Sequence, residues 1–142
     1  MSTEQNKILV RRYFEQVVNR VDRAAADELV APNLVFNSPY TPQPTQDRES
    51  FLQMLTAVHA AFPDFNLVDH DLIAEGDQIA SRWTVYGTHD GELAGMPPSR
   101  KKVAITGLSI YRIANGKIVE GWVQDDTIQQ LTAASQATRT TA

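Results

Sequence analysis

The spacing of hydrophobic residues along this chain changes near residue 65. Before that point apolar side chains recur at helical spacing, and after it they alternate with polar ones, as in strands. The helical pattern predicts three helices, each after a capping residue: 3–21 after Ser2 or Thr3, 23–30 after Asp22, and 48–62 after Thr45 or Asp47. The alternating pattern predicts strands at 66–76, 78–91, 103–114 and 117–126, and a shorter strand lies earlier, at 33–39.

The order of these elements indicates the fold class. Helices come first and a mainly antiparallel sheet follows, which is typical of an α+β domain with helices on one face of a bent sheet. Proline-containing segments at 40–47 and 92–102 are predicted to be loops. No repeat or linker divides the 142 residues, so we expect one domain over 1–134 and a disordered tail over 135–142.

The dipeptide Asn115-Gly116 is the strongest hairpin signal in the chain and predicts a type I′ turn. A two-residue turn fixes the register of the strands on either side of it. Unbroken pairing from this turn places Trp122 and Asp126 on one face of the sheet and Asp125 on the other. A β-bulge would exchange these assignments for part of the strand.

Asp126 is the main candidate for chemistry on this hairpin. In the unbroken register it neighbours Trp122 and Ile105, two apolar side chains. An apolar setting suits a carboxyl group that takes and returns a proton near neutral pH. The alternative is a solvated carboxylate at the end of the strand that caps the following turn.

Composition excludes several classes of function. The net charge is −4 and the only basic cluster is 100–102, so we expect no nucleic-acid partner. The chain has no cysteine, which excludes disulfides, thiolate zinc sites and cysteine nucleophiles. The run Asp69-His70-Asp71 alternates across a strand and does not converge, so we expect no metal site. No apolar run is long enough for a signal core or a membrane span, which predicts a soluble, cytoplasmic protein.

Several segments, taken in their order and spacing, resemble the SnoaL-like polyketide cyclases of the nuclear-transport-factor-2-like superfamily. They are AFPDF (61–65), EGDQIASRW (75–83), GTHDGELAGMPPS (87–99), YRIANGKIVEGW (111–122), and Asp126 with Gln129–Leu131. The resemblance covers most of the chain. It implies a cone-shaped, curved, mainly antiparallel sheet wrapped around the N-terminal helices, a pocket between them, and a homodimer packed through the outer face of the sheet.

The resemblance also implies a reaction. Characterised members close a polyketide ring by intramolecular aldol condensation without metal or cofactor, and the matching acid/base is Asp126, four residues after Trp122. The sequence departs from the family at Gly121, where a His is frequent. Ketosteroid isomerases, on the same scaffold, place a catalytic Asp where this chain has Asn37. Limonene epoxide hydrolases need an Asp-Arg-Asp set, of which Arg82 and Asp126 supply two members.

The predicted site therefore combines catalytic and substrate-binding residues. The catalytic candidates are Asp126 as general acid/base and His89 as its partner or as a hydrogen-bond donor to substrate. The substrate-binding candidates share aromatic or polar side chains near the expected pocket: Tyr13, Asn37, His59, Arg82, Trp83 and Trp122. Structural readings stay open for each, such as a core histidine for His59 and an ion pair for Arg82.

Three functions fit these residues. The first is a cofactor-independent cyclase acting on a small apolar, polyketide-like carbonyl compound. The second is a non-catalytic module that binds a small apolar molecule in the same pocket. The third is a hydrolase resembling the epoxide hydrolases of this scaffold.

Overall fold

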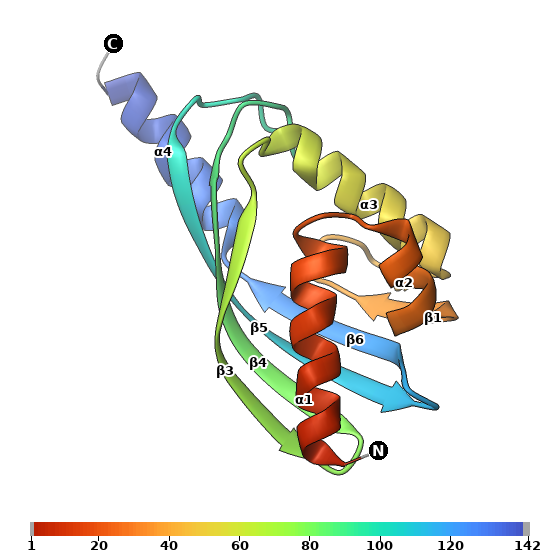
Figure 1. The fold of residues 1–142 in the computed structure, drawn as a ribbon. Coiled ribbons are helices and arrows are strands. Elements are labelled where there is room, and N and C mark those ends of the chain that lie inside the picture. The colour runs from red at the N-terminus through yellow and green to blue at the C-terminus, as the bar shows by residue number, and fades with distance from the viewer. Residues whose placement is uncertain (1, 141–142) are drawn as a thin grey trace.

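The chain folds as helices followed by one curved sheet (Figure 1). The computed structural model describes residues 2–140. Its helical elements are α1 (Thr3–Arg12), η1 (Tyr13–Val18), α2 (Arg23–Leu29), α3 (Arg48–Ala61) and α4 (Thr127–Thr140). Its strands are β1 (Val30–Asn37), β2 (Thr45–Gln46), β3 (Asn66–Glu75), β4 (Gln78–Thr88), β5 (Lys102–Ala114) and β6 (Lys117–Asp125).

The predicted helix starts are confirmed by their caps. The Ser2 side chain accepts a hydrogen bond from the Gln5 backbone, and the Gln5 side chain accepts one from the Ser2 backbone, which completes a capping box. Asp22 and Asp47 accept hydrogen bonds from backbone N–H groups in the first turns of α2 and α3. These contacts satisfy donors that a helix leaves unpaired at its N-terminus.

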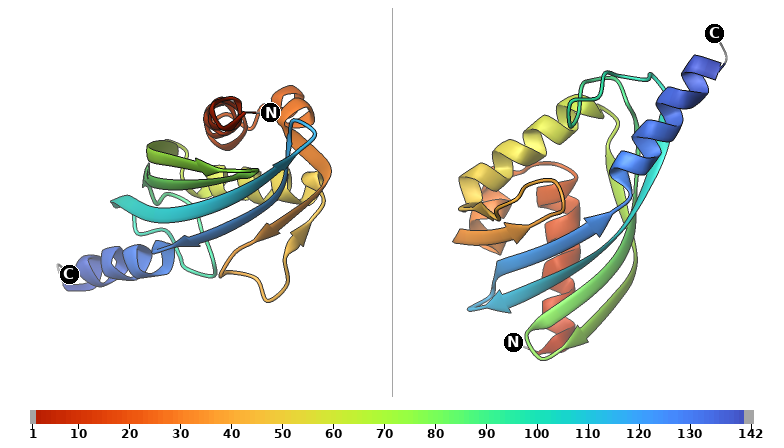
Figure 2. Two further views of the ribbon diagram at one scale, coloured as in Figure 1. Left: turned by 90° about the horizontal axis from the view of Figure 1, so that it is seen from below. Right: turned by 180° about the vertical axis from the view of Figure 1, so that it is seen from behind.

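The sheet has six strands in the order β2-β1-β6-β5-β4-β3, and the α+β prediction is confirmed. All neighbours are antiparallel except β1 and β6, which run parallel. Figures 1 and 2 show the long strands curving around α1 and α3, which lie on the concave face. This curvature leaves space between the sheet and α3 that side chains from both line.

The first predicted helix is interrupted by a π-helical segment, η1. The Asn19 N–H donates to the Phe14 carbonyl, five residues earlier, at 2.9 Å. A π turn widens the helix and is frequent at functional sites. Here it buries two adjacent pairs of side chains, Tyr13 with Phe14 and Val17 with Val18, against the concave face of the sheet.

The hairpin between β5 and β6 has the predicted turn but not the predicted register. Asn115 and Gly116 both have positive φ, as a type I′ turn requires. Beyond Ile113↔Ile118 the next pair is Arg112↔Glu120, so Val119 is an extra residue in β6. The unbroken register is therefore wrong, because this β-bulge shifts every later residue of β6 by one position.

Helix α4 is longer than the sequence suggests. A disordered tail was expected from 135, whereas the helix continues to Thr140, and residues 141–142 lie outside the described part. Leu131 is fully buried and anchors the helix. Because helix growth is cooperative, an anchored first turn favours continuation. None of the helices in residues 2–140 combines the length and apolar character needed to cross a membrane.

Candidate active-site cavity

A cavity of about 340 Å³ lies between α3, η1 and the concave face of the sheet. Its lining is mostly aromatic and aliphatic, with aromatic side chains contributed by several elements: Tyr13, Phe14, Phe36, Phe51, Phe62 and Trp83. Among the described residues that line it, Asp125 is the only one with a charged side chain. The cavity therefore combines an apolar wall with one carboxyl group.

The bulge at Val119 is what directs Asp125 into this cavity. After the bulge, Gly121 pairs with Tyr111 and Asp125 pairs with Gly107, and the side chains of β5 at these positions are on the buried face. If Val119 were paired with Arg112 in an unbroken register, Asp125 would lie on the outer face of the sheet. One inserted residue thus decides which of two adjacent carboxylates faces the cavity.

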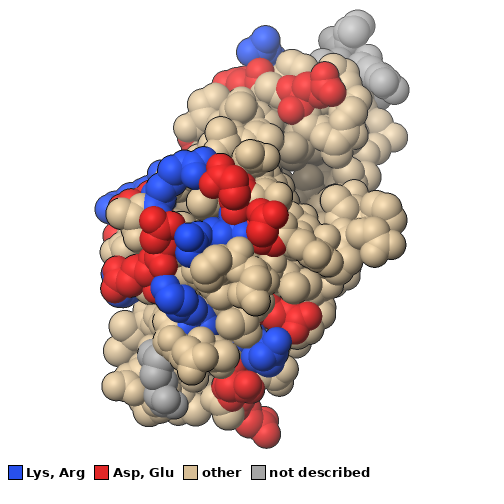
Figure 3. Space-filling view, turned by 90° about the vertical axis from the view of Figure 1, so that its right-hand side faces the viewer, with Lys and Arg blue, Asp and Glu red and all other residues tan. Residues whose placement is uncertain are grey.

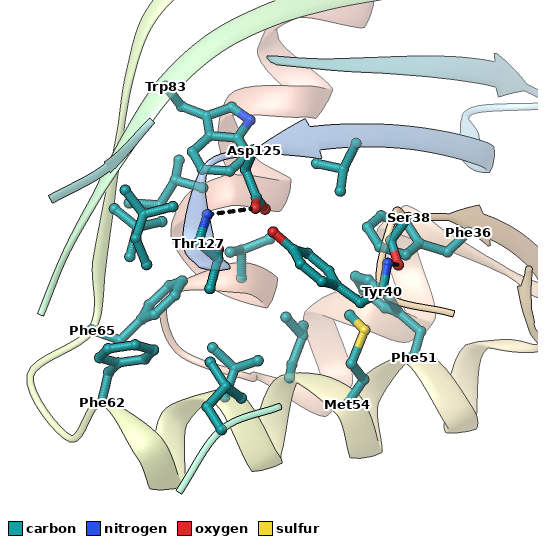
Figure 4. Close-up of a pocket in the computed structure, with 18 of the residues that line it drawn as sticks. Phe36, Ser38, Tyr40, Phe51, Met54, Phe62, Phe65, Trp83, Asp125 and Thr127 are labelled. Carbon is teal, nitrogen blue, oxygen red and sulfur yellow. Dashed lines mark hydrogen bonds between the residues drawn. The ribbon is translucent and has the colours of Figure 1, made fainter. Parts of the chain in front are cut away.

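Trp83 lies beside Asp125 because Gly107 leaves room for its ring (Figure 4). A Cβ atom at Gly107 would overlap the Trp83 ring. The Trp83 indole N–H donates to the Ser109 hydroxyl at 2.8 Å, which holds the ring in place. Asp125 is consequently next to a fixed aromatic surface.

The Asp125 carboxyl is held by one local partner. Its Oδ1 accepts a hydrogen bond from the Thr127 backbone N–H at 3.1 Å. Burial raises the pKa of Asp125, hydrogen bonds from the Thr127 backbone and side chain offset part of the rise, and the adjacent Asp126 charge adds to it. A carboxyl group with a raised pKa is suited to proton transfer nearer neutral pH.

Asp126 has a structural position instead. Its two carboxylate oxygens accept hydrogen bonds from the Thr106 backbone N–H at 2.8 Å and from the Thr106 hydroxyl at 3.1 Å. Its carboxylate also accepts from the Gln130 side chain in the first turn of α4, at 3.1 Å. The prediction that Asp126 faces the pocket is wrong, because the bulge turns it away and its carboxylate instead joins Thr106 of β5 to Gln130 of α4.

Tyr13 and Trp83 line the cavity, as the sequence predicts. His89 does not belong to the described lining of the cavity. It is fully buried behind Phe62, with the two ring centroids 5.6 Å apart. Burial lowers the pKa of His89. His59 is also outside the lining, because its Nε2 is 2.8 Å from the Val18 carbonyl oxygen.

Three other candidates lie away from the cavity. The Asn37 amide donates to the Gly121 carbonyl oxygen at 3.0 Å and joins β1 to β6, while its neighbours on either side face the cavity. Arg82 is on the outer face, where its Nε donates to Asp71 at 2.7 Å. Trp122 is 37% exposed and also faces outward, since the bulge reverses the face assigned to it.

Sequence reasoning missed five cavity residues with polar groups: Ser38, Tyr40, Thr41, Tyr111 and Thr127. Tyr40 stands in a proline-rich loop that looked featureless, yet Figure 4 shows its side chain reaching across the cavity with the hydroxyl toward Asp125. Tyr111 was visible as an aromatic residue on the same face as Ser109. Its two-residue spacing from Ser109 was the available signal.

The outer surface carries paired rather than clustered charges. On the side of the molecule in Figure 3, basic and acidic residues are interspersed. The pairs include Arg12–Glu28, Arg23–Glu49 and Arg48–Asp27. Exposed pairs of this kind contribute little to stability. Within residues 2–140, no three His, Asp or Glu side chains gather as a metal site would require.

A curved sheet that encloses a cavity with N-terminal helices defines the nuclear-transport-factor-2-like class of α+β proteins. Within this class, the sequence model of the SnoaL-like polyketide cyclases matches residues 8–134. The chain belongs to the SnoaL-like polyketide cyclase family.

Solved structures agree with this assignment. IdmH from Streptomyces antibioticus, a proposed polyketide cyclase, is 31% identical over 92% of this chain and 97% of its own, with a TM-score of 0.79. A proposed SnoaL-like polyketide cyclase from Jannaschia sp. CCS1 is 23% identical over 94% and 93%, with a TM-score of 0.85. AclR from Streptomyces galilaeus, a proposed hydroxylase, is 27% identical over 87% and 80%, with a TM-score of 0.73. Comparison with curated proteins gives no significant match.

Proposed function

We propose that this protein is an acid/base enzyme that closes a ring in a neutral, polyketide-like carbonyl compound, with Asp125 as the proton-transfer group. One observation carries the proposal: Asp125 is the single carboxyl group among the described residues of an otherwise apolar cavity. The direction of its pKa shift, upward through burial, supports the same conclusion. Membership of the cyclase family supplies the reaction class.

The proposed reaction needs only the substrate and the Asp125 side chain, which takes one proton and later returns it. The Asp125 carboxylate takes a proton from the carbon next to a carbonyl group, which leaves an enolate. The enolate carbon forms a bond to a second carbonyl carbon of the same molecule, and the electron pair of that C=O bond becomes an alkoxide. The Asp125 carboxylic acid then returns its proton to the alkoxide.

The lining favours a neutral, largely aromatic substrate. No Lys or Arg is among the described lining residues, so an anionic group would meet the Asp125 carboxylate without a counter-charge. Ligand pockets range from about 300 to 1,000 Å³, and the volume of about 340 Å³ is near the lower end. A compound of two or three rings suits such a space.

The test is exchange of α-protons in a neutral aromatic ketone, 2-acetylnaphthalene, followed by NMR in D₂O. We expect wild-type protein to accelerate exchange of the methyl protons and Asp125→Asn to reduce the rate by about 10²–10⁴-fold, the usual contribution of general base catalysis. Asp126→Asn is the matched control, because it removes the adjacent carboxylate, which is outside the cavity lining and is only the last of the causes that shift the Asp125 pKa. If Asp125→Asn exchanged the methyl protons at the wild-type rate, the assignment of Asp125 would be refuted.

The same experiment separates the two alternatives. A non-catalytic binding module would bind the ketone without accelerating exchange, and the almost wholly apolar lining favours this as the second candidate. The epoxide-hydrolase arrangement has less support, because Arg82 pairs with Asp71 on the outer face of the sheet. The scaffold alone does not decide, since one structural neighbour is a proposed hydroxylase.

A homodimer through the outer face of the sheet is part of the proposal. Leu108 and Ile110 of β5 are 59% and 44% exposed, and Ile110 pairs with Trp122, which is also exposed. These three side chains are adjacent on two neighbouring strands, on the face opposite the cavity. A second copy of the chain would remove this apolar surface from water.

A further inference from the structure

The loop at 38–44 joins β1 to β2 and forms part of the cavity wall. Its residues in the lining are Ser38, Tyr40 and Thr41. Both ends of the loop are held in the sheet, since Phe36 pairs with Thr45 beyond it. Three of its seven residues are prolines, and each proline ring fixes one backbone dihedral. The backbone of this loop therefore has few conformations available to it.

The three hydroxyl groups of the loop have different partners. The Thr41 hydroxyl donates to the Gln43 carbonyl oxygen at 2.6 Å, and the Ser38 hydroxyl oxygen accepts from the Tyr40 backbone N–H at 3.3 Å. The Tyr40 hydroxyl has no hydrogen-bond partner within residues 2–140. A phenol hydroxyl donates one hydrogen bond, so Tyr40 keeps a donor that a ligand can use.

This donor is directed toward the carboxyl group of the cavity. Figure 4 shows the Tyr40 side chain reaching across the cavity with its hydroxyl toward Asp125. In the described part of the chain the two groups are not hydrogen-bonded to each other, and Asp125 accepts instead from the Thr127 backbone N–H at 3.1 Å. Tyr40 is 42% exposed, so it lies where the cavity meets solvent.

A ketone carries its oxygen and its acidic C–H carbon on the same carbonyl carbon. A base that takes the proton and a donor that holds the oxygen must therefore lie close to one another. From the positions of the two side chains we infer that Tyr40 donates a hydrogen bond to the carbonyl oxygen of the bound substrate, beside Asp125. Tyr40 would then also hold the oxygen of the enolate that Asp125 generates. The enolate step rests on the proposed function, whereas the binding of a neutral ketone by Tyr40 does not.

Tyr111, another phenol of the lining, is less suited to this task. It pairs with Gly121, whereas Asp125 pairs with Gly107, four residues further along each strand. This separation is about 13 Å at about 3.3 Å per residue. With Tyr40 as the donor, the carbonyl group of the substrate lies at the edge of the cavity near solvent, and its aromatic part lies against the apolar wall.

The test measures the carbonyl stretch of 2-acetylnaphthalene, labelled with ¹³C at the carbonyl carbon, by isotope-edited infrared spectroscopy. We expect the band of the ketone bound to wild-type protein to lie below its position in an alkane solvent, because a hydrogen bond weakens the C=O bond. Tyr40→Phe keeps the ring over the cavity and removes the hydroxyl, and should return the band toward the alkane value. It should also weaken binding by about 2- to 10-fold, as for loss of one neutral hydrogen bond.

Exchange of the methyl protons at saturating ketone measures the enolate step. We expect Tyr40→Phe to slow this exchange by about 10- to 100-fold, because a hydrogen bond to a charged oxygen is stronger than one to a neutral oxygen. Tyr86→Phe is the matched control. Tyr86 is 49% exposed on β4 and is not among the described lining residues, so its loss of a hydroxyl should change neither the band nor the exchange rate.

The two readouts separate this inference from the proposed function. Asp125→Asn should lose exchange and keep the wild-type band. If wild-type protein bound the ketone without exchanging its protons, but Tyr40→Phe still moved the band, the proposed reaction would fail and the binding role of Tyr40 would stand. A band at its wild-type position in Tyr40→Phe would overturn the inference, whether or not wild-type protein exchanges protons. Failure of the ketone to bind wild-type protein would overturn it equally.

Discussion

Asp125 and Asp126 are adjacent at the end of β6, but their side chains have different surroundings. Asp125 is beside Trp83 in an apolar cavity, with Thr127 as its local partner. Asp126 accepts hydrogen bonds from Thr106 and Gln130 and joins the sheet to α4. The first setting disfavours a negative charge and the second provides donors for one. At the residue scale, the two side chains are therefore suited to different tasks, proton transfer for Asp125 and a link between β5 and α4 for Asp126.

This difference predicts an unusual dependence of stability on pH. Because the pKa of Asp125 is raised in the folded state, folding favours its protonated form. The contribution of this group to stability is present at low pH and decreases as the pH rises from the unfolded value, about 3.9, through the folded pKa. We expect Asp125→Asn to have the higher free energy of unfolding at neutral pH and to lose this advantage in acid.

Urea denaturation at a series of pH values measures this prediction. The quantity of interest is the difference in free energy of unfolding between wild type and Asp125→Asn, which cancels the titration of all other groups. Asp126→Asn serves as the control for a carboxylate outside the cavity. If this difference in free energy of unfolding stayed constant across the acid range, burial would not raise the pKa of Asp125.

At the scale of elements, the bulge in β6 has the largest consequence. The strand before the bulge pairs as the Asn115-Gly116 turn dictates, with Ala114 opposite Lys117. After the bulge, inward and outward positions are exchanged relative to unbroken pairing. The π-helical segment η1 acts in a similar way on the facing side, since it places Tyr13 and Phe14 together in the cavity wall. Both irregularities lie next to the site, as irregularities in strands and helices commonly do.

Deletion of Val119 tests the effect of the bulge. Deletion joins Ile118 to Glu120, and these two residues already pair with Ile113 and Arg112, so Asp125 should stay opposite Gly107. We expect the deletion variant to keep ketone exchange, measured by NMR, because the register of β6 and not the bulged residue itself turns Asp125 toward the cavity.

Val119→Ala is the matched control, because it shortens the side chain and keeps the residue count of β6. It should also retain exchange activity. Loss of exchange in the deletion variant alone would show that the bulged backbone itself is needed.

At the scale of the whole molecule, the two faces of the sheet have separate uses. The concave face encloses the cavity together with α3 and η1. The opposite face presents Leu108, Ile110 and Trp122 to solvent in a single chain. A monomer rarely leaves adjacent large apolar residues exposed without a use for them. The proposed dimer would cover them without obstructing the cavity.

Leu108→Asp with Ile110→Asp should therefore shift the protein from dimer to monomer, because two charges would be buried at the contact. Analytical ultracentrifugation measures the change. Ile8→Asp is the control, since Ile8 is 57% exposed on α1, which lies on the concave side of the sheet and away from the proposed contact. A wild-type protein that sediments as a monomer would contradict the proposal.

Local patterns in the sequence predicted the features that depend on neighbours in the chain. Ser2, Asp22 and Asp47 were recognisable as helix caps because a cap bonds to backbone groups two or three residues away. Asn115-Gly116 was recognisable because few other dipeptides favour positive φ at both positions. The change of hydrophobic period gave the α+β class, and Tyr13 and Trp83 followed as cavity residues from the family resemblance.

Only the tertiary structure decided which of the other candidate site residues lie at the cavity. A bulge follows from the packing of both faces of a strand, so the residues of β6 alone did not show whether Asp125 or Asp126 is buried. The side chains of His59, His89 and Asn37 have suitable polar groups. Their positions, however, depend on segments far away in the chain: His59 and Asn37 are hydrogen-bonded to distant backbone carbonyls, and His89 is fully buried. The sequence by itself determined the elements and their order, because these rest on short-range preferences. The three-dimensional packing selected which carboxyl group faces the cavity, because the cavity consists of contacts between residues far apart in the chain.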